Sequence, residues 1–141
     1  MRQSRIAPKF VDFIPDKLEE GVLYVSERYR TCSHLCCCGC GEEVVTPLSP
    51  AEWSLSVRGT TVSLHPSIGN WDYACRSHYV IQDNAVRWAG AMSAQAVAAV
   101  QRRDAEDLAA QVLAINRAKI KRPWWRRLFS SFVGWIKEIC R

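Results

Sequence analysis

The chain has 141 residues, enough for one small domain with an appendage, and 48% of them are hydrophobic against 23% charged, which predicts a folded core. Its net charge of +5 is uneven, because the last 25 residues carry eight basic side chains and one acidic one, whereas the first 116 residues carry a charge of −2. A nearly neutral body is not expected to bind nucleic acid, so a charged partner is sought at the basic C-terminal segment.

The N-terminal residues, the apolar runs and the cysteines together indicate a cellular compartment. The first residues contain no apolar stretch of the kind found in signal peptides, and no run reaches the roughly 18 apolar residues of a membrane span. We therefore expect a cytoplasmic protein. Thiols stay reduced in the cytoplasm, so the seven cysteines predict metal binding or thiol chemistry rather than disulfides.

Short strand patterns separated by turn residues fill the first two thirds of the chain. They are "FVDFI" before Pro15, "GVLYVS", "EEVVTPL", the pair "WSLSVRG" and "TTVSLHP" around Gly59, and the pair "HYVIQ" and "AVRWA" around "DN". The last two pairs have the spacing of hairpins. We predict a small, mostly antiparallel β domain over residues 1–90, stapled by zinc because a core of this size gains much from a cross-link.

The sequence changes to a helical pattern from residue 91. The 27 residues from Ser93 to Lys119 contain neither Gly nor Pro, and Ser93 is the expected N-cap. Pro123 ends this helix or begins another. We therefore predict a helix over residues 91–122 and an α+β fold class, with the helical segment C-terminal to the β domain.

Residues 123–141 predict a second helix that is basic and amphipathic. At 100° per residue, its charged and small side chains fall on one arc and its apolar side chains, three tryptophans among them, fall on the other. Three roles are open to the apolar face: packing on the β domain, contact with a membrane surface, and docking on a partner protein. Peripheral membrane contact is thus an alternative to a purely cytoplasmic protein.

Two cysteine-containing pairs have the spacing of metal ligands. Cys37 and Cys40 form C-x-x-C, and Cys75 and His78 form C-x-x-H after 34 intervening residues. Two tight turns that each supply two ligands suit tetrahedral zinc, and four protein ligands leave no position for water. We predict a structural zinc site built from these four residues.

The ligand choice within the first cluster stays open. Cys36 and Cys38 lie close enough to replace a predicted ligand, and C-x-C pairings are alternatives to C-x-x-C. A catalytic zinc would need three protein ligands and a nearby general base, for which Glu42 and Glu43 are the candidates.

Ser67 is a candidate nucleophile. It lies in "HPSIGN", where Pro66 fixes the backbone before it and Gly69 loosens the backbone after it. A serine presented in a tight turn becomes nucleophilic when a base lies within hydrogen-bond reach. We expect the side-chain amide of Asn70 to stabilise an oxyanion.

Three histidines are candidate bases for Ser67. His78 cannot take the serine proton if it binds zinc. His65 lies two residues from Ser67 and shares its side of an extended chain. His34 lies three residues before the first predicted ligand, where the metal can hold it near Ser67. We expect His34 to be the base.

Three segments together resemble a small bacterial family. They are "FIPDKLEEGVLYVS", "HLCCCGCGEEVVTPLSPAEW" and "SLHPSIGNWDYACRSHYVI". Genes of this family lie in operons that encode ubiquitin-like proteins with E1-like and E2-like enzymes. The resemblance covers about residues 10–90. It implies a zinc-containing, serine-protease-type enzyme, similar to a deubiquitinase, that processes or removes the ubiquitin-like protein and has the E1-like and E2-like enzymes as partners.

The resemblance also bears on single residues. It supports Ser67 and His34 as nucleophile and base and the Cys/His pairs as metal ligands, while it leaves the third catalytic group open. Two other functions remain alternatives: a non-catalytic zinc-binding adaptor in the conjugation pathway, and a zinc-dependent metallohydrolase. Ser67→Ala separates them from the serine enzyme, because only the serine enzyme loses turnover.

Overall fold

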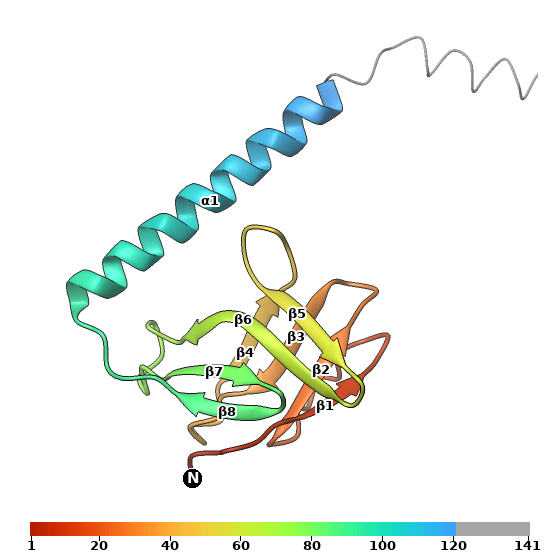
Figure 1. Ribbon diagram of the computed structural model, residues 1–141, viewed down its shortest axis with the longest axis vertical. Helices are drawn as coiled ribbons and strands as arrows, with labels where there is room; N and C mark the ends of the chain where they lie inside the picture. Colours follow the sequence, from red (N-terminus) through yellow and green to blue (C-terminus); the bar gives the residue numbers. More distant parts are fainter. Residues whose placement is uncertain (121–141) are drawn as a thin grey trace, which may run out of the picture. The chain divides into compact units, whose positions relative to one another are not determined.

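The computed structural model of the protein describes residues 1–120. Within them, eight strands precede one helix (Figure 1). The elements are β1 (Ala7–Phe10), β2 (Val22–Ser26), β3 (Thr31–Leu35), β4 (Glu43–Pro47), β5 (Ser54–Arg58), β6 (Thr61–Gly69), β7 (His78–Gln82), β8 (Ala85–Trp88) and α1 (Ala94–Ile120). The predicted amphipathic helix over residues 123–141 lies outside the described residues.

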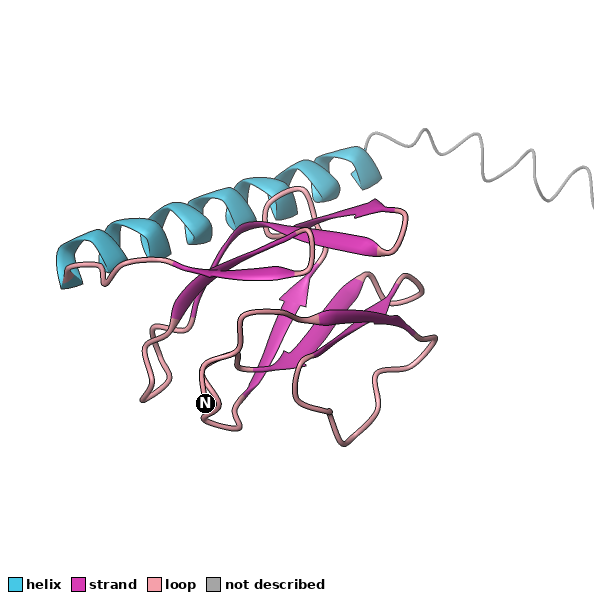
Figure 2. Ribbon diagram, turned by 60° about the horizontal axis from the view of Figure 1, so that its bottom comes forward, coloured by secondary structure: helices cyan, strands magenta, loops and turns pink. Residues whose placement is uncertain are grey.

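The strands form two four-stranded sheets that lie in two layers (Figure 2). The first sheet has the order β1-β2-β3-β4, and the second has the order β5-β6-β7-β8. All pairs are antiparallel except β1 with β2, which run parallel. The predicted class, a mostly antiparallel β domain followed by a helix, is confirmed.

The two predicted hairpins are confirmed, and their turn residues explain them. The β5–β6 turn contains Gly59 at φ 58°, and the β7–β8 turn contains Asp83 and Asn84 at φ 49° and 63°. In the β7–β8 turn, positive φ at both central residues gives a twist that matches that of the flanking strands. The Asn84 side chain also accepts a hydrogen bond from the Val62 backbone N–H at 2.8 Å, which ties this turn to β6.

The first sheet differs from the prediction at two strands. β1 ends at Phe10, so most of "FVDFI" follows the strand instead of forming it. β3, with the sequence "TCSHL", was not predicted, because its polar residues do not indicate a buried strand. Ser33 and His34 are 3% and 0% exposed because β3 lies between β2 and β4.

One hydrophobic core joins the two sheets. Alternate residues of the central strands point into it, as the period of two requires. The buried core residues of these strands include Leu23, Val25, Cys32, Val62, Leu64, Tyr79 and Ile81. Because the cluster draws on both sheets, the strands of the two layers are fixed relative to one another.

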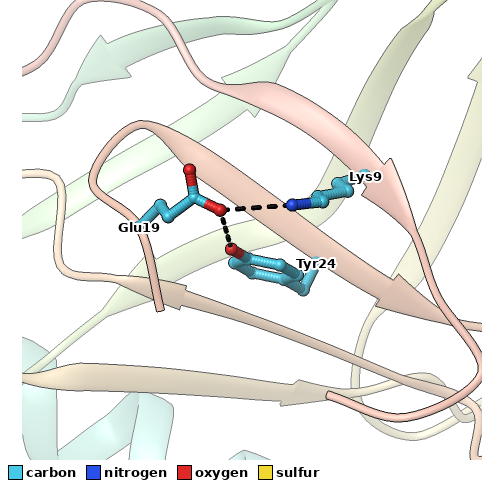
Figure 3. A network of polar contacts seen from close by, with 3 residues as sticks. All are labelled: Lys9, Glu19 and Tyr24. Atoms are coloured by element: carbon cyan, nitrogen blue, oxygen red, sulfur yellow. Dashed lines mark hydrogen bonds and ion pairs between the residues drawn. The ribbon is translucent and has the colours of Figure 1, made fainter. Parts of the chain in front are cut away.

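A small polar network ties the loop before β2 to the first sheet (Figure 3). One carboxylate oxygen of Glu19 accepts hydrogen bonds from the Tyr24 hydroxyl at 2.9 Å and from Lys9 Nζ at 3.1 Å. The bond from Tyr24, with that from Lys9, lowers the pKa of Glu19, and Glu19 in turn raises the pKa of Lys9. The ion pair is exposed, so it adds little to the stability of the protein. Its effect is on the position of the loop.

The helix begins at the predicted cap. Ser93 Oγ accepts a hydrogen bond from the Ala96 backbone N–H at 3.2 Å, as an N-cap does. In residues 1–120, helical structure nowhere combines the length and apolar character of a membrane span. Residue contacts divide the chain inside α1 into two units, residues 1–104 and 105–141. The division predicted from sequence, at residues 90 and 122, stays a prediction.

Candidate active site and metal centre

Ser67 on β6 and His78 on β7 form a hydrogen-bonded pair. The distance from His78 Nε2 to Ser67 Oγ is 3.0 Å. His78 lies opposite Gly69 in the ladder, and Gly69 lies two residues after Ser67. Directly opposed residues and residues two apart share one face of a sheet, so strand register brings the serine and the imidazole together.

Ser67 lies where the β6–β7 ladder is irregular. The ladder pairs Leu64 with Ile81, is then interrupted, and resumes at the pair of Ile68 with Tyr79. Such interruptions bend a strand and redirect its side chains, and they are common beside active sites. Ser67 is half-buried, so it can meet a substrate while it stays in contact with His78.

The partner of the second ring nitrogen of His78 bears on which of the two nitrogens carries the proton. Nδ1 lies 3.4 Å from the backbone carbonyl of Gly90. A carbonyl only accepts hydrogen bonds, so a neutral His78 ring that bonds to it carries its proton on Nδ1, which leaves Nε2 to accept from the Ser67 hydroxyl. This tautomer is the one that a general base requires.

Trp71 covers one side of the His78 ring. The two ring centroids are 5.0 Å apart. The same indole lies so close to Gly69 that a Cβ at that position would overlap with its ring atoms. Glycine at residue 69 is therefore required for Trp71 to lie over β6 beside the imidazole.

Gly69→Ala is expected to destabilise the protein by about 1–3 kcal/mol, the usual cost of overpacking, because the indole must move away from β6. Denaturant unfolding measures this loss. Gly90→Ala is the matched control, since a Cβ at Gly90 meets no atom within 4 Å. Equal stability of the two variants would contradict the packing of Trp71 described here.

His34, the base expected from sequence, lies elsewhere. It is fully buried on β3, in the other sheet, and its Nε2 is 2.8 Å from the Tyr79 hydroxyl. Burial lowers the pKa of His34 to about 4, so the ring is neutral at physiological pH. The structure brings His78, not His34, to Ser67, while His65 is exposed.

Asn70, the expected oxyanion donor, is occupied by other contacts. Its Nδ2 donates to Ser77 Oγ at 2.8 Å and to Cys36 Sγ at 3.4 Å. These two bonds use both hydrogens of the side-chain amide. Asn70 is buried, and its contacts make it a residue that positions its neighbours.

Four cysteines gather at one end of the β domain. The sulfur atoms of Cys36, Cys38, Cys40 and Cys75 all lie within 4.8 Å of one another. The set shares Cys40 and Cys75 with the prediction from sequence, and it has Cys36 and Cys38 where that prediction has Cys37 and His78. The grouping follows the C-x-C alternation of residues 36, 38 and 40.

The other two predicted ligands have different surroundings. Cys37 is 0% exposed within the hydrophobic core, and burial raises the pKa of its thiol to about 12, so it remains neutral. His78 contacts Ser67 and Gly90 through its two ring nitrogens. Cys32 is also buried in the core, as expected of a spare cysteine.

Backbone conformation brings the first three sulfurs together. Gly39 has φ 83°, and its N–H donates to the Cys36 carbonyl at 3.0 Å. This left-handed conformation favours glycine and turns the chain between Cys38 and Cys40. Cys75 then approaches from the segment before β7.

The geometry of the four sulfurs fits a metal ion. Tetrahedral Zn–S bonds of about 2.3 Å place sulfurs about 3.8 Å apart. Here Cys36 Sγ lies 3.4 Å from Cys38 Sγ and 3.9 Å from Cys75 Sγ. Two polar groups, Ser77 Oγ at 3.1 Å and Asn70 Nδ2 at 3.4 Å, approach the Cys36 sulfur, as hydrogen-bond donors do around metal-bound thiolates. The residues present therefore suit a metal site with four sulfur ligands.

Ser77 links the cluster of four cysteines to the Ser67–His78 pair. Its hydroxyl lies 3.1 Å from Cys36 Sγ and 3.6 Å from Cys75 Sγ, and its carbonyl accepts a hydrogen bond from the Asn70 N–H at 2.9 Å. The next residue, His78, begins β7. The contacts around the sulfurs therefore also fix the start of the strand that carries the imidazole.

A pocket of about 170 Å³ lies at the end of β6. Its lining comes from β4, from the end of β6 and the loop that follows it, and from Trp53. The lining residues are Val44, Val45, Trp53, Ile68, Gly69, Asn70, Trp71, Asp72 and Tyr73. Ser67 and His78 are not among these lining residues, but two that are lie next to His78: Gly69 is opposite it in the ladder, and the Trp71 ring is 5.0 Å from its ring.

Comparisons with known proteins bear on this site. No curated protein and no solved structure matches the chain. One family model, described as "Bacterial ubiquitination-like system serine protease (BubE)", matches residues 10–89, which is more than half of the chain and contains both Ser67 and His78. The resemblance inferred from the sequence is confirmed, and the chain belongs to the BubE family of serine proteases of bacterial ubiquitination-like systems.

Proposed function

We propose that the protein is a serine-type protease or isopeptidase that processes or deconjugates the ubiquitin-like protein of its system. The observation that carries this proposal is the 3.0 Å contact of Ser67 Oγ with His78 Nε2, with a backbone carbonyl 3.4 Å from the other ring nitrogen. Family membership supports the same chemistry. The E1-like and E2-like enzymes of the pathway are the proposed partners.

The proposed mechanism is acyl transfer. Ser67 Oγ attacks the carbonyl carbon at the C-terminal bond of the ubiquitin-like protein as its proton passes to His78 Nε2. Backbone N–H groups near Ser67 hold the oxyanion. The bond to the leaving group then breaks, and the leaving group takes the proton from His78. Water, deprotonated by His78, attacks the acyl-enzyme and releases the product.

Zinc is the proposed metal, and its role is structural. Cys36, Cys38, Cys40 and Cys75 would hold it, and four thiolate ligands leave no open position for a water nucleophile. Zinc would cross-link the loop of residues 36–40 to the segment before β7. Through their contacts with Cys36 Sγ, Asn70 and Ser77 would also hold β7, the strand that carries His78, in place.

A fluorophosphonate activity probe tests the proposal. We expect one adduct per chain on Ser67 by intact-protein mass spectrometry, and none on Ser67→Ala. His65→Gln, which changes an exposed histidine of the same strand, should label at the wild-type rate. Absence of an adduct on folded protein loaded with zinc, with binding of the ubiquitin-like protein retained, would favour a non-catalytic adaptor instead.

A further inference from the structure

We propose that the pocket beside Ser67 and His78 is a subsite that binds one bulky apolar side chain of the substrate, next to the bond that is cleaved. The inference rests on the proposed function and deepens it, because it assigns a substrate class to the site. It predicts that the cleaved sequence contains a large aliphatic or aromatic residue within one or two positions of the scissile bond.

The position of the pocket supports this role. Gly69 lines it and lies two residues after Ser67, a separation of about 6.6 Å along a strand. Trp71 forms a wall of the pocket with the indole that also contacts the His78 ring. A substrate carbonyl bonded to Ser67 therefore has a neighbouring side chain within reach of the pocket.

The size and lining of the pocket define the ligand. Its volume of about 170 Å³ is below the roughly 300 Å³ at which pockets for drug-sized ligands begin, so it suits a single side chain. The lining includes Trp53, Trp71 and Tyr73, together with three aliphatic side chains. Asp72 supplies the one charge among the lining residues. The surface that these residues expose to the pocket is about half polar and half apolar, so burial of a side chain against its apolar half favours binding.

Two polar groups at the pocket are consistent with a bound peptide. The Tyr73 hydroxyl is already satisfied, because it donates to the Glu43 carbonyl at 2.6 Å. The Nε1–H of Trp53, in contrast, is buried and has no acceptor within residues 1–120. A peptide carbonyl of the substrate can supply that acceptor. β4, which contributes Val44 and Val45, is an edge strand, where an extended peptide can pair.

Sulfonyl fluorides of different shape test the inference. Ser67 Oγ attacks the sulfur, the O–S bond forms, the S–F bond breaks, fluoride leaves and His78 takes the proton. Methanesulfonyl fluoride places only a methyl group beside the serine, whereas phenylmethanesulfonyl fluoride places a benzyl group there. Sulfonylation rates of Ser67 are read by intact-protein mass spectrometry, and 4-(2-aminoethyl)benzenesulfonyl fluoride adds a positively charged arm.

Val45→Trp is designed to fill the pocket without disturbing the core, because Val45 is 51% exposed and lines the pocket. Val57→Trp is the matched control, since Val57 is 48% exposed on β5 and does not line it. For each reagent, the sulfonylation rate of the variant is divided by that of the wild type. This ratio does not depend on the intrinsic reactivity of the reagent. We expect Val45→Trp to slow the benzyl reagent about tenfold or more relative to the methyl reagent, and Val57→Trp to leave that ratio unchanged.

Each outcome has a separate meaning. If neither neutral reagent modifies Ser67, the proposed function fails. If both modify it and Val45→Trp leaves their ratio unchanged, the function stands and the subsite is wrong. A larger effect of Val45→Trp on the ammonium-bearing reagent than on the benzyl reagent would also overturn the apolar assignment, because Asp72 would then be selecting a cation.

Discussion

Replacing His78 by glutamine is expected to lower turnover at Ser67 roughly 10³-fold, within the range that general bases contribute. The glutamine amide keeps a polar group near Ser67 Oγ but cannot accept its proton, so the nucleophile is no longer activated. The measurement is kcat for release of a reporter fused to the C-terminus of the ubiquitin-like protein of the same system. KM should change far less, because His78 acts on the chemical step.

Two further histidines provide the controls. His65→Gln should keep wild-type turnover, because His65 is exposed and Ser67 Oγ has its hydrogen bond with His78 instead. His34→Gln should lower thermal stability, since His34 is fully buried against Tyr79, and turnover should be retained below the unfolding transition. Full activity of His78→Gln, with activity lost in folded His34→Gln, would restore His34 as the base.

Loss of the metal is expected to destabilise the β domain by several kcal/mol, because metal binding contributes directly to the folding of small domains. The four sulfurs join residues 36–40 to residue 75, and without a metal they are crowded thiols with no bond between them. The measurement is the unfolding temperature with and without a zinc chelator, together with metal content by mass spectrometry. One zinc per chain is expected before chelation.

Single cysteine variants test which sulfurs bind the metal. Cys36→Ser should lose the metal and most of the stability that it confers. Cys37→Ala should keep one metal per chain and lose about 1–3 kcal/mol, the packing of a small buried side chain. Metal loss in Cys37→Ala, with metal retained in Cys36→Ser, would favour the C-x-x-C pair over the observed grouping.

Features set by neighbouring residues were predictable from sequence. The β7–β8 hairpin needs Asp83 and Asn84 in positive φ, and the sequence shows both between two alternating segments. The helix cap at Ser93 is equally local. β3 escaped prediction because its burial comes from the strands on either side, which no local pattern of "TCSHL" reveals.

The site depended on relations between distant residues. Spacing alone could not choose among the sulfurs of "CCCGC", because the choice depends on the turn that Gly39 makes. The C-x-x-H spacing predicted His78 as a metal ligand. In the structure, strand register places His78 opposite Gly69, and its Nε2 contacts Ser67 Oγ. Ser67 was identified as a candidate from an expected tight turn; that expectation is wrong, because β6 runs through Ser67 to Gly69. The assignment of its role stays a proposal.

The segment that links the cluster of four cysteines to the His78 imidazole does not tolerate a change of length. Cys75 belongs to the sulfur group, Ser77 contacts two of its sulfurs, and His78 is opposite Gly69. Inserting or deleting one residue here would turn the side chains that follow to the opposite face of β7. We therefore expect natural variation in loop length to spare residues 75–78, even where the amino acids themselves change.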